Sequence, residues 1–137
     1  MKIEIFALCD AATEGGGKLN LLGAFDVMGA QSLPLIHPSC AVAIRIRFNR
    51  IESGSHRIKL DVVDEDGRHV VPAFETVVDI QPEDGVESAV ANLLLNFQQL
   101  RFEKFGRYSI DLAVDGRHEG ALPIYIRQSP APAERTL

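Results

Sequence analysis

Apolar and polar residues alternate along much of this chain, and this period of two predicts β-strands with one face in a core and the other in water. Residues 42–48 are the clearest case, because Val, Ile, Ile and Phe alternate there with one Ala and two Arg. Similar runs recur at 58–62, 108–114 and 122–126. These segments predict a fold built from half-buried strands.

Three further runs are less regular. Residues 70–78 contain Pro72, which cannot donate to a β-ladder, so we expect that strand to be bulged or at a sheet edge. Residues 18–28 contain Gly23, which predicts a strand bent or bulged at the glycine. The apolar residues of 86–97 fit either a helix or a strand, and we favour a strand because the neighbouring segments read as β.

Turn residues between the regular runs predict two hairpins. The polar residues at 52–55 follow the first run, and we expect a hairpin in which Ile46 lies opposite Leu60. Asp-Gly at 115–116 joins the second pair of runs. A two-residue loop would turn the apolar residues of the last strand away from the core, so we predict a bulge at Gly116.

Many short strands separated by turn signals favour two packed sheets over a βαβ array. We therefore predict an all-β fold, an antiparallel β-sandwich of about 7–9 strands with at most one short helix. Residues 1–127 are expected to form one domain, and 128–137, where Pro alternates with Ala, a disordered C-terminal tail. Tyr108, just after Gly106, resembles the tyrosine corner of immunoglobulin-like domains.

The composition of the chain argues against several classes of partner and location. The chain has 137 residues, of which 46% are hydrophobic, and a formal net charge of −5. That length suits one domain, and the acidic balance argues against nucleic acid or an anionic membrane as a partner. No apolar run approaches the roughly 18 residues that a membrane span needs. Cys9 and Cys40 share the phase of apolar neighbours, so we expect both to be buried, unbridged thiols of a cytoplasmic protein.

The sequence holds no motif that dictates a reaction, and we assign no catalytic residue, no metal ligand and no cofactor. The glycine-rich loop at 14–18 lacks the remaining residues of a phosphate-binding P-loop. Asp-Gly-Arg-His occurs twice, at 66–69 and 115–118. If the two turns lay side by side, His69 and His118 could form a metal site, and a metal-dependent hydrolase is the least favoured of our hypotheses.

One surface feature is basic. In the hairpin expected above, Arg45, Arg47, Arg57 and Lys59 share one solvent-facing side, with Arg47 opposite Lys59. Like charges opposed across a ladder cost stability, and a bound anion or acidic partner would offset that cost. A solvated sheet face remains the simpler interpretation of the same residues.

Four segments together resemble a family of small bacterial proteins of unknown function over residues 1–127. They are IEIFALCDAA, GGGKLNLLGAFD, LLLNFQQLRFEKFGRYSIDLAVDG and LPIYI. The resemblance implies a cytosolic β-sandwich and supplies no activity or site residues.

We therefore expect a non-enzymatic interaction or assembly module that binds a protein partner or self-associates into a homo-oligomer through an edge strand. The alternative is a small-ligand or anion binder that uses Arg45, Arg47, Arg57 and Lys59.

Overall fold

The computed structural model describes residues 1–130, so most of the predicted tail, 131–137, lies outside the described residues. It is an all-β fold with one short 3₁₀ turn, in agreement with the prediction from periodicity. The strands are β1 (Lys2–Gly15), β2 (Lys18–Ala24), β3 (Val27–Ala30), β4 (Leu35–Asn49), β5 (Gly54–Val63), β6 (Phe74–Ile80), β7 (Ser88–Phe102), β8 (Gly106–Val114) and β9 (Arg117–Gln128), and the 3₁₀ turn η1 is Arg50–Glu52.

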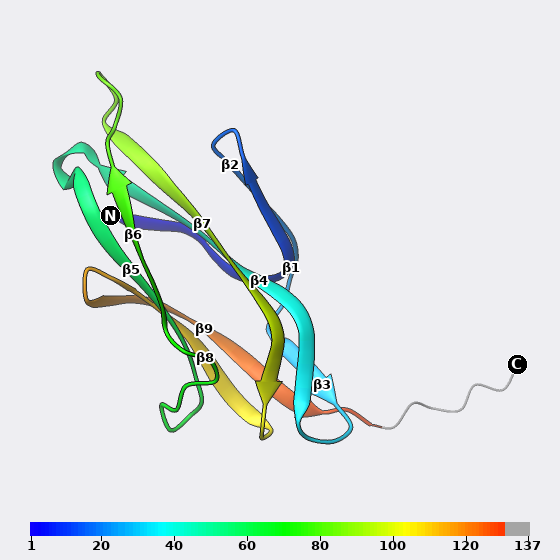
Figure 1. The fold of residues 1–137 in the computed structure, drawn as a ribbon. Helices are drawn as coiled ribbons and strands as arrows, with labels where there is room; N and C mark the ends of the chain where they lie inside the picture. The colour runs from blue at the N-terminus through cyan, green and yellow to red at the C-terminus, as the bar shows by residue number, and fades with distance from the viewer. Residues whose placement is uncertain (131–137) are drawn as a thin grey trace, which may run out of the picture.

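The strands form two sheets that pack face to face (Figure 1). Sheet A has the order β2-β1-β4-β7, and sheet B has the order β3-β9-β8-β5-β6. Every neighbouring pair is antiparallel except β3 and β9, which run parallel. The predicted antiparallel sandwich is therefore confirmed, with this one parallel pair as an addition.

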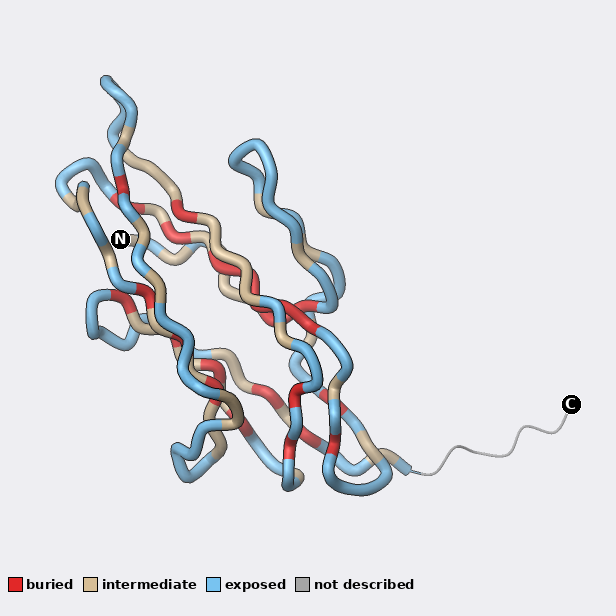
Figure 2. The backbone as a smooth tube through the Cα atoms, viewed as in Figure 1, coloured by how far each residue is buried: buried red, intermediate tan, exposed pale blue. Residues whose placement is uncertain are grey.

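The core lies between the sheets, where the apolar positions of each period-two run meet (Figure 2). Phe48 on β4 is fully buried, and the flanking Arg47 points outward. The largest fully buried side chains are Phe48, Phe102, Ile46, Ile58, Ile110, Leu112, Ile124, Ile126, Val42, Val62 and Cys9. Burial of this apolar surface is the main term that favours folding.

The predicted pairing of 42–48 with 58–62 was wrong. The turn η1 and Ser53 carry the chain from β4 in sheet A across to β5 in sheet B, so Ile46 and Leu60 lie on facing sheets and both belong to the core. The alternation showed correctly which residues face inward. It could not show which strand lies next to which, because two facing sheets and one hairpin give the same inward pattern.

The second predicted hairpin, β8 with β9, is confirmed, but its bulge lies elsewhere. Asp115 and Gly116 both have positive φ, +52° and +80°, which gives a two-residue turn of the kind that joins tight hairpins. The extra residue is on β9, where Gly120 pairs with Leu112 but His118 pairs with Ala113. Glu119 is thus the bulged residue, and it returns the rest of β9 to the inward phase.

Strands β1 and β2 form a hairpin arm over the outer face of sheet A, and here the arm is defined as residues 9–24. The N-terminal half of β1 pairs with β4, and the C-terminal half pairs with β2. Leu19 and Leu21 of the arm pack on Ala41 and Ala43 of β4. Because these alanines are small, the arm lies close to the sheet and buries them completely.

The remaining predictions on secondary structure are tested at β6, β7 and β9. The run with Pro72 leads into β6, an edge strand, and residues 88–97 of the ambiguous segment 86–97 lie in β7, as favoured. Strand β9 continues to Gln128, and the N–H of Ser129 donates to Ala30 O at 2.9 Å. Within residues 1–130, no helix is long and apolar enough to span a membrane.

Candidate functional site

The four basic residues proposed as one binding face do not share a face. Arg45 and Arg47 lie on the outer side of β4 in sheet A, whereas Arg57 and Lys59 lie on the outer side of β5 in sheet B. The two pairs are therefore on opposite sides of the sandwich. The pairing of Arg47 with Lys59, which motivated a joint anion site, is not formed.

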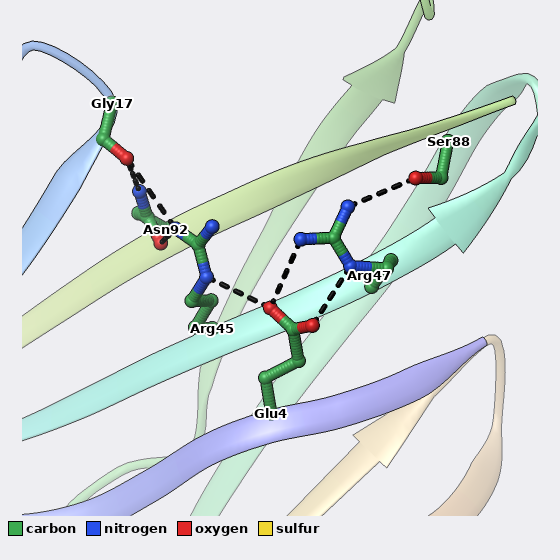
Figure 3. Close-up of polar contacts among 6 residues, drawn as sticks. All are labelled: Glu4, Gly17, Arg45, Arg47, Ser88 and Asn92. Carbon is green, nitrogen blue, oxygen red and sulfur yellow. Dashed lines mark hydrogen bonds and ion pairs between the residues drawn. The ribbon is translucent and has the colours of Figure 1, made fainter. Parts of the chain in front are cut away.

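On sheet A, an internal carboxylate already lies between the two arginines (Figure 3). A bulge in β1 between Ile3 and Ile5 turns Glu4 outward, opposite β4. Arg45 Nε donates to Glu4 Oε1 at 2.8 Å, and Arg47 Nε donates to Oε2 at 2.8 Å. The carboxylate therefore lies where an anion would bind to a pair of guanidinium groups.

Neighbouring strands complete this network (Figure 3). Arg45 Nη1 donates to Asn92 Oδ1 at 3.1 Å, and Asn92 Nδ2 donates to Gly17 O at the tip of the arm at 3.2 Å. Arg47 Nη1 donates to Ser88 Oγ at 2.9 Å. The network thus joins β1, β4, β7 and the arm, and its first role is to hold the outer face of sheet A together.

The electrostatics agree with that role. Hydrogen bonds from Arg47 and then Arg45 lower the pKa of Glu4, so its carboxylate stays ionised at neutral pH. On sheet B, Lys59 Nζ lies 3.8 Å from Asp61 Oδ2 and its strand position is opposite Glu75. Each basic pair therefore has acidic neighbours from its own chain.

A second polar cluster, at one end of the sandwich, was not foreseen from the sequence. The ring of His56 stacks on Phe48 with centroids 4.4 Å apart. Its Nδ1 lies 2.6 Å from Asp115 Oδ2, and its Nε2 lies 2.5 Å from the carbonyl oxygen of Glu52. These residues line a cavity of about 390 Å³ between the ends of the two sheets, together with Arg117.

Both ring nitrogens of His56 face acceptors, which requires a proton on each. Burial alone would lower the pKa of His56, but the bonds to Asp115 and to the Glu52 carbonyl outweigh burial and raise it. The bond to His56 and the N–H of Arg57 in turn lower the pKa of Asp115. An imidazolium held in this way has no lone pair for a metal or a substrate proton, and its two contacts tie β5 to η1 and to the β8–β9 turn.

The two histidines of the Asp-Gly-Arg-His repeats lie along the outer face of sheet B. His69 Nε2 is 3.0 Å from Asp61 Oδ1, and His118 Nε2 is 3.7 Å from Asp111 Oδ1. Asp61 and Asp111 are themselves opposite each other on β5 and β8. Over residues 1–130, no group of three or more His, Cys, Asp or Glu side chains is arranged to hold a metal ion.

Both cysteines are buried free thiols, as predicted. Cys40 belongs to the core between the sheets, whereas Cys9 lies at the base of the arm, where its thiol donates to Ala41 O at 3.5 Å. Burial raises the pKa of Cys40 to about 11 and also raises that of Cys9. Neither thiol is available as a nucleophile at neutral pH.

The most unusual surface feature is the free edge of β7. This strand has 15 residues and, in the described part of the chain, one strand partner, β4. No charged residue and no proline occurs from Ser88 to Leu100. Proteins normally protect such an edge with charge, proline, a bulge or a short strand, since its unpaired amides and carbonyls otherwise recruit another strand.

The other three edges show this protection. Strand β3 has 4 residues, and β2 has 7 with Lys18 at its start. Strand β6 also has 7 residues, and it carries Glu75 and Asp79. The uncharged run in β7 was visible in the sequence, but its position at an edge follows only from the sheet order.

The comparisons with known proteins concern fold and family. Part of one solved structure, the Pseudomonas fluorescens alkylpurine DNA glycosylase AlkC bound to DNA containing an abasic site analog, has a similar fold, with a TM-score of 0.50 and 12% sequence identity. The likeness covers 92% of this chain and 30% of the glycosylase chain, so this chain spans less than a third of its length. At this identity the likeness is one of fold alone. No curated protein matches the sequence.

The family comparison covers almost the whole sandwich. Residues 4–127, from the bulge in β1 almost to the end of β9, match a family that is described as one of unknown function. The resemblance inferred from the sequence segments is thereby confirmed. The chain belongs to the family of unknown function DUF6941.

Proposed function

We propose that this protein is a non-enzymatic interaction module of the cytoplasm that binds an extended protein segment along the free edge of β7. The observation that carries the proposal is the long, uncharged and unprotected edge of this strand. Backbone amides and carbonyls along such an edge pair with an added strand, and the side chains between them select the partner.

The side chains of β7 favour an apolar, uncharged partner. Leu93, Leu95 and Phe97 face the core but stay only partly buried, because among residues 1–130 no strand lies beyond β7 in sheet A. An added strand would remove more of their surface from water, at about 25 cal/mol per Å² of apolar area.

The architecture further supports placement among immunoglobulin-like sandwiches, which commonly serve binding. In immunoglobulin-like domains the strands are lettered in chain order, and strands A-B-E of one sheet face strands G-F-C-C′ of the other. Here β1-β4-β7 of sheet A correspond to A-B-E, and β9-β8-β5-β6 of sheet B correspond to G-F-C-C′. Tyr108 Oη donates to Lys104 O at 2.8 Å, as in a tyrosine corner. The ring of Tyr108 packs edge-on against that of Phe102, with the ring centroids 4.8 Å apart.

Binding to an array of extended, uncharged peptides tests this function. We expect some of these peptides to bind the protein and to change the NMR chemical shifts of backbone amides along β7. Asn96→Lys places a charge at an exposed position of this strand and should abolish that binding. Leu22→Lys, on the opposite edge of the same sheet, is the matched control and should leave it intact. Peptide binding that survives Asn96→Lys contradicts the proposal, and so does an absence of binding by a chain that is monomeric in solution.

A further inference from the structure

Residues 92–96, in the middle of β7, form a palindrome centred on Leu94. It reads Asn92-Leu93-Leu94-Leu95-Asn96, so the same residue types follow in both directions. Two antiparallel copies related by a two-fold axis pair each residue with its mirror position about the centre. A strand of this composition is therefore complementary to itself.

We infer that the partner of the β7 edge is a second copy of this chain, paired antiparallel with β7 across a two-fold axis at Leu94. This inference rests on the proposed function, since it names the strand that the free edge takes. This pairing joins sheet A of one copy to sheet A of the other, so that two four-stranded sheets become one continuous sheet.

The inward face of β7 fits this register. Leu93 of one copy lies opposite Leu95 of the other, which extends the apolar core across the axis. The next inward pair places Ala91 opposite Phe97, so a small side chain leaves room for a large one. Large and small residues in alternation are what close packing across such a pair needs.

The outward face fits as well. Leu94 meets its own copy on the axis, and Asn92 lies opposite Asn96, where two amides can exchange hydrogen bonds. No charge meets a like charge, although each chain has a formal net charge of −5. Within each copy, Arg45 Nη1 also donates to Asn92 Oδ1 at 3.1 Å.

Disulfide trapping tests the register. Leu94→Cys should give a covalent dimer under mild oxidation, because the two introduced thiols meet on the axis. Asn92→Cys and Asn96→Cys should each stay uncross-linked alone and form a covalent dimer when mixed. The buried Cys9 and Cys40 do not compete, and Leu22→Cys on exposed β2 is the control for random collision.

Light scattering on the native chain supplies an independent measurement. We expect a dimer at high micromolar concentration and a monomer for Asn96→Lys, with Leu22→Lys still dimeric. Because Asn96 is exposed, its substitution by Lys should not prevent folding, and circular dichroism verifies this.

The outcomes separate this inference from the proposed function. A dimer that cross-links through Leu94→Cys and through the mixed asparagine variants supports the inference. A native chain that is monomeric, or a dimer that cross-links no better than the Leu22→Cys control, overturns the second copy or its register. The function proposed for β7 then still stands or falls on the peptide array.

Discussion

Removing the negative charge beside His56 should make the stability of this protein depend on pH in a defined direction. Asp115→Asn is the most conservative change, because Asn tolerates the positive φ of +52° at this turn position. Its amide oxygen can still accept the N–H of Arg57, which now donates to Asp115 Oδ1 at 2.9 Å. The substitution therefore isolates the contact of the carboxylate with the imidazolium.

The size of the effect follows from the geometry. A hydrogen bond to a charged group contributes about 1.5–3 kcal/mol, but exposed ion pairs contribute only about 0.2–1 kcal/mol. The side chain of His56 is 14% exposed and that of Asp115 is 49% exposed. Because solvent screens the carboxylate, we expect a loss of about 1 kcal/mol, or about fivefold in the unfolding equilibrium.

The direction with pH follows from the raised pKa of His56. The folded state holds this proton more tightly than the unfolded chain, so the stabilisation is complete below the ordinary pKa of about 6.5. It is lost as the pH rises through the raised value in the folded state. Asp115→Asn should thus cost about 1 kcal/mol at about pH 5.5, and much less at a pH above the raised value, where His56 is neutral in both proteins.

Urea unfolding at the two pH values measures the difference, and an NMR titration of the His56 ring should show a lower pKa in the variant. Asp111→Asn is the matched control, because His118 lies 3.7 Å from this carboxylate and is 63% exposed. An equal loss at both pH values, or an unchanged pKa of His56, would refute the reasoning.

Three further substitutions test other parts of the account. Glu4→Gln removes the carboxylate that lies between Arg45 and Arg47. At equal ionic strength, phosphate should therefore raise the melting temperature of the variant more than that of the native chain. Equal rises in melting temperature would show that Glu4 does not occupy an anion site. Ala43→Leu overfills the space beneath the arm and should cost about 1–3 kcal/mol, with faster amide exchange in β2; unchanged exchange would contradict the packing. Tyr108→Phe removes the bond to the Lys104 carbonyl and should cost about 1 kcal/mol in chemical denaturation, whereas unchanged stability would show that the corner contributes nothing.

The sequence predicted the inward and outward faces of strands better than it predicted their neighbours. The alternation at 42–48 placed Ile46 and Phe48 in the core, where both are completely buried. The assumption that consecutive runs pair as a hairpin then failed for β4 and β5, because the chain crosses between sheets at η1. Local periodicity describes burial, whereas pairing depends on contacts far apart in the sequence.

The same distinction explains the candidate sites. Arg45 and Arg47 were predicted to share an outer face, and they do, but the carboxylate between them comes from Glu4, far away in the sequence. His56 and Asp115 meet only because β5 and β8 are neighbours. By contrast, the palindrome around Leu94 is entirely local, and only its position at an edge needed the structure.

Amide hydrogen exchange along β7, followed as the protein is diluted, tests the central claim most directly. Consider the amides of β7 that point away from β4, toward the free edge. If a second copy covers this edge, these amides exchange slowly at high concentration and faster on dilution. The free-edge amides of β2 and β6 exchange fast at every concentration. If the β7 amides exchange as fast as those of β6 at every concentration, the edge is free in solution and the account is contradicted.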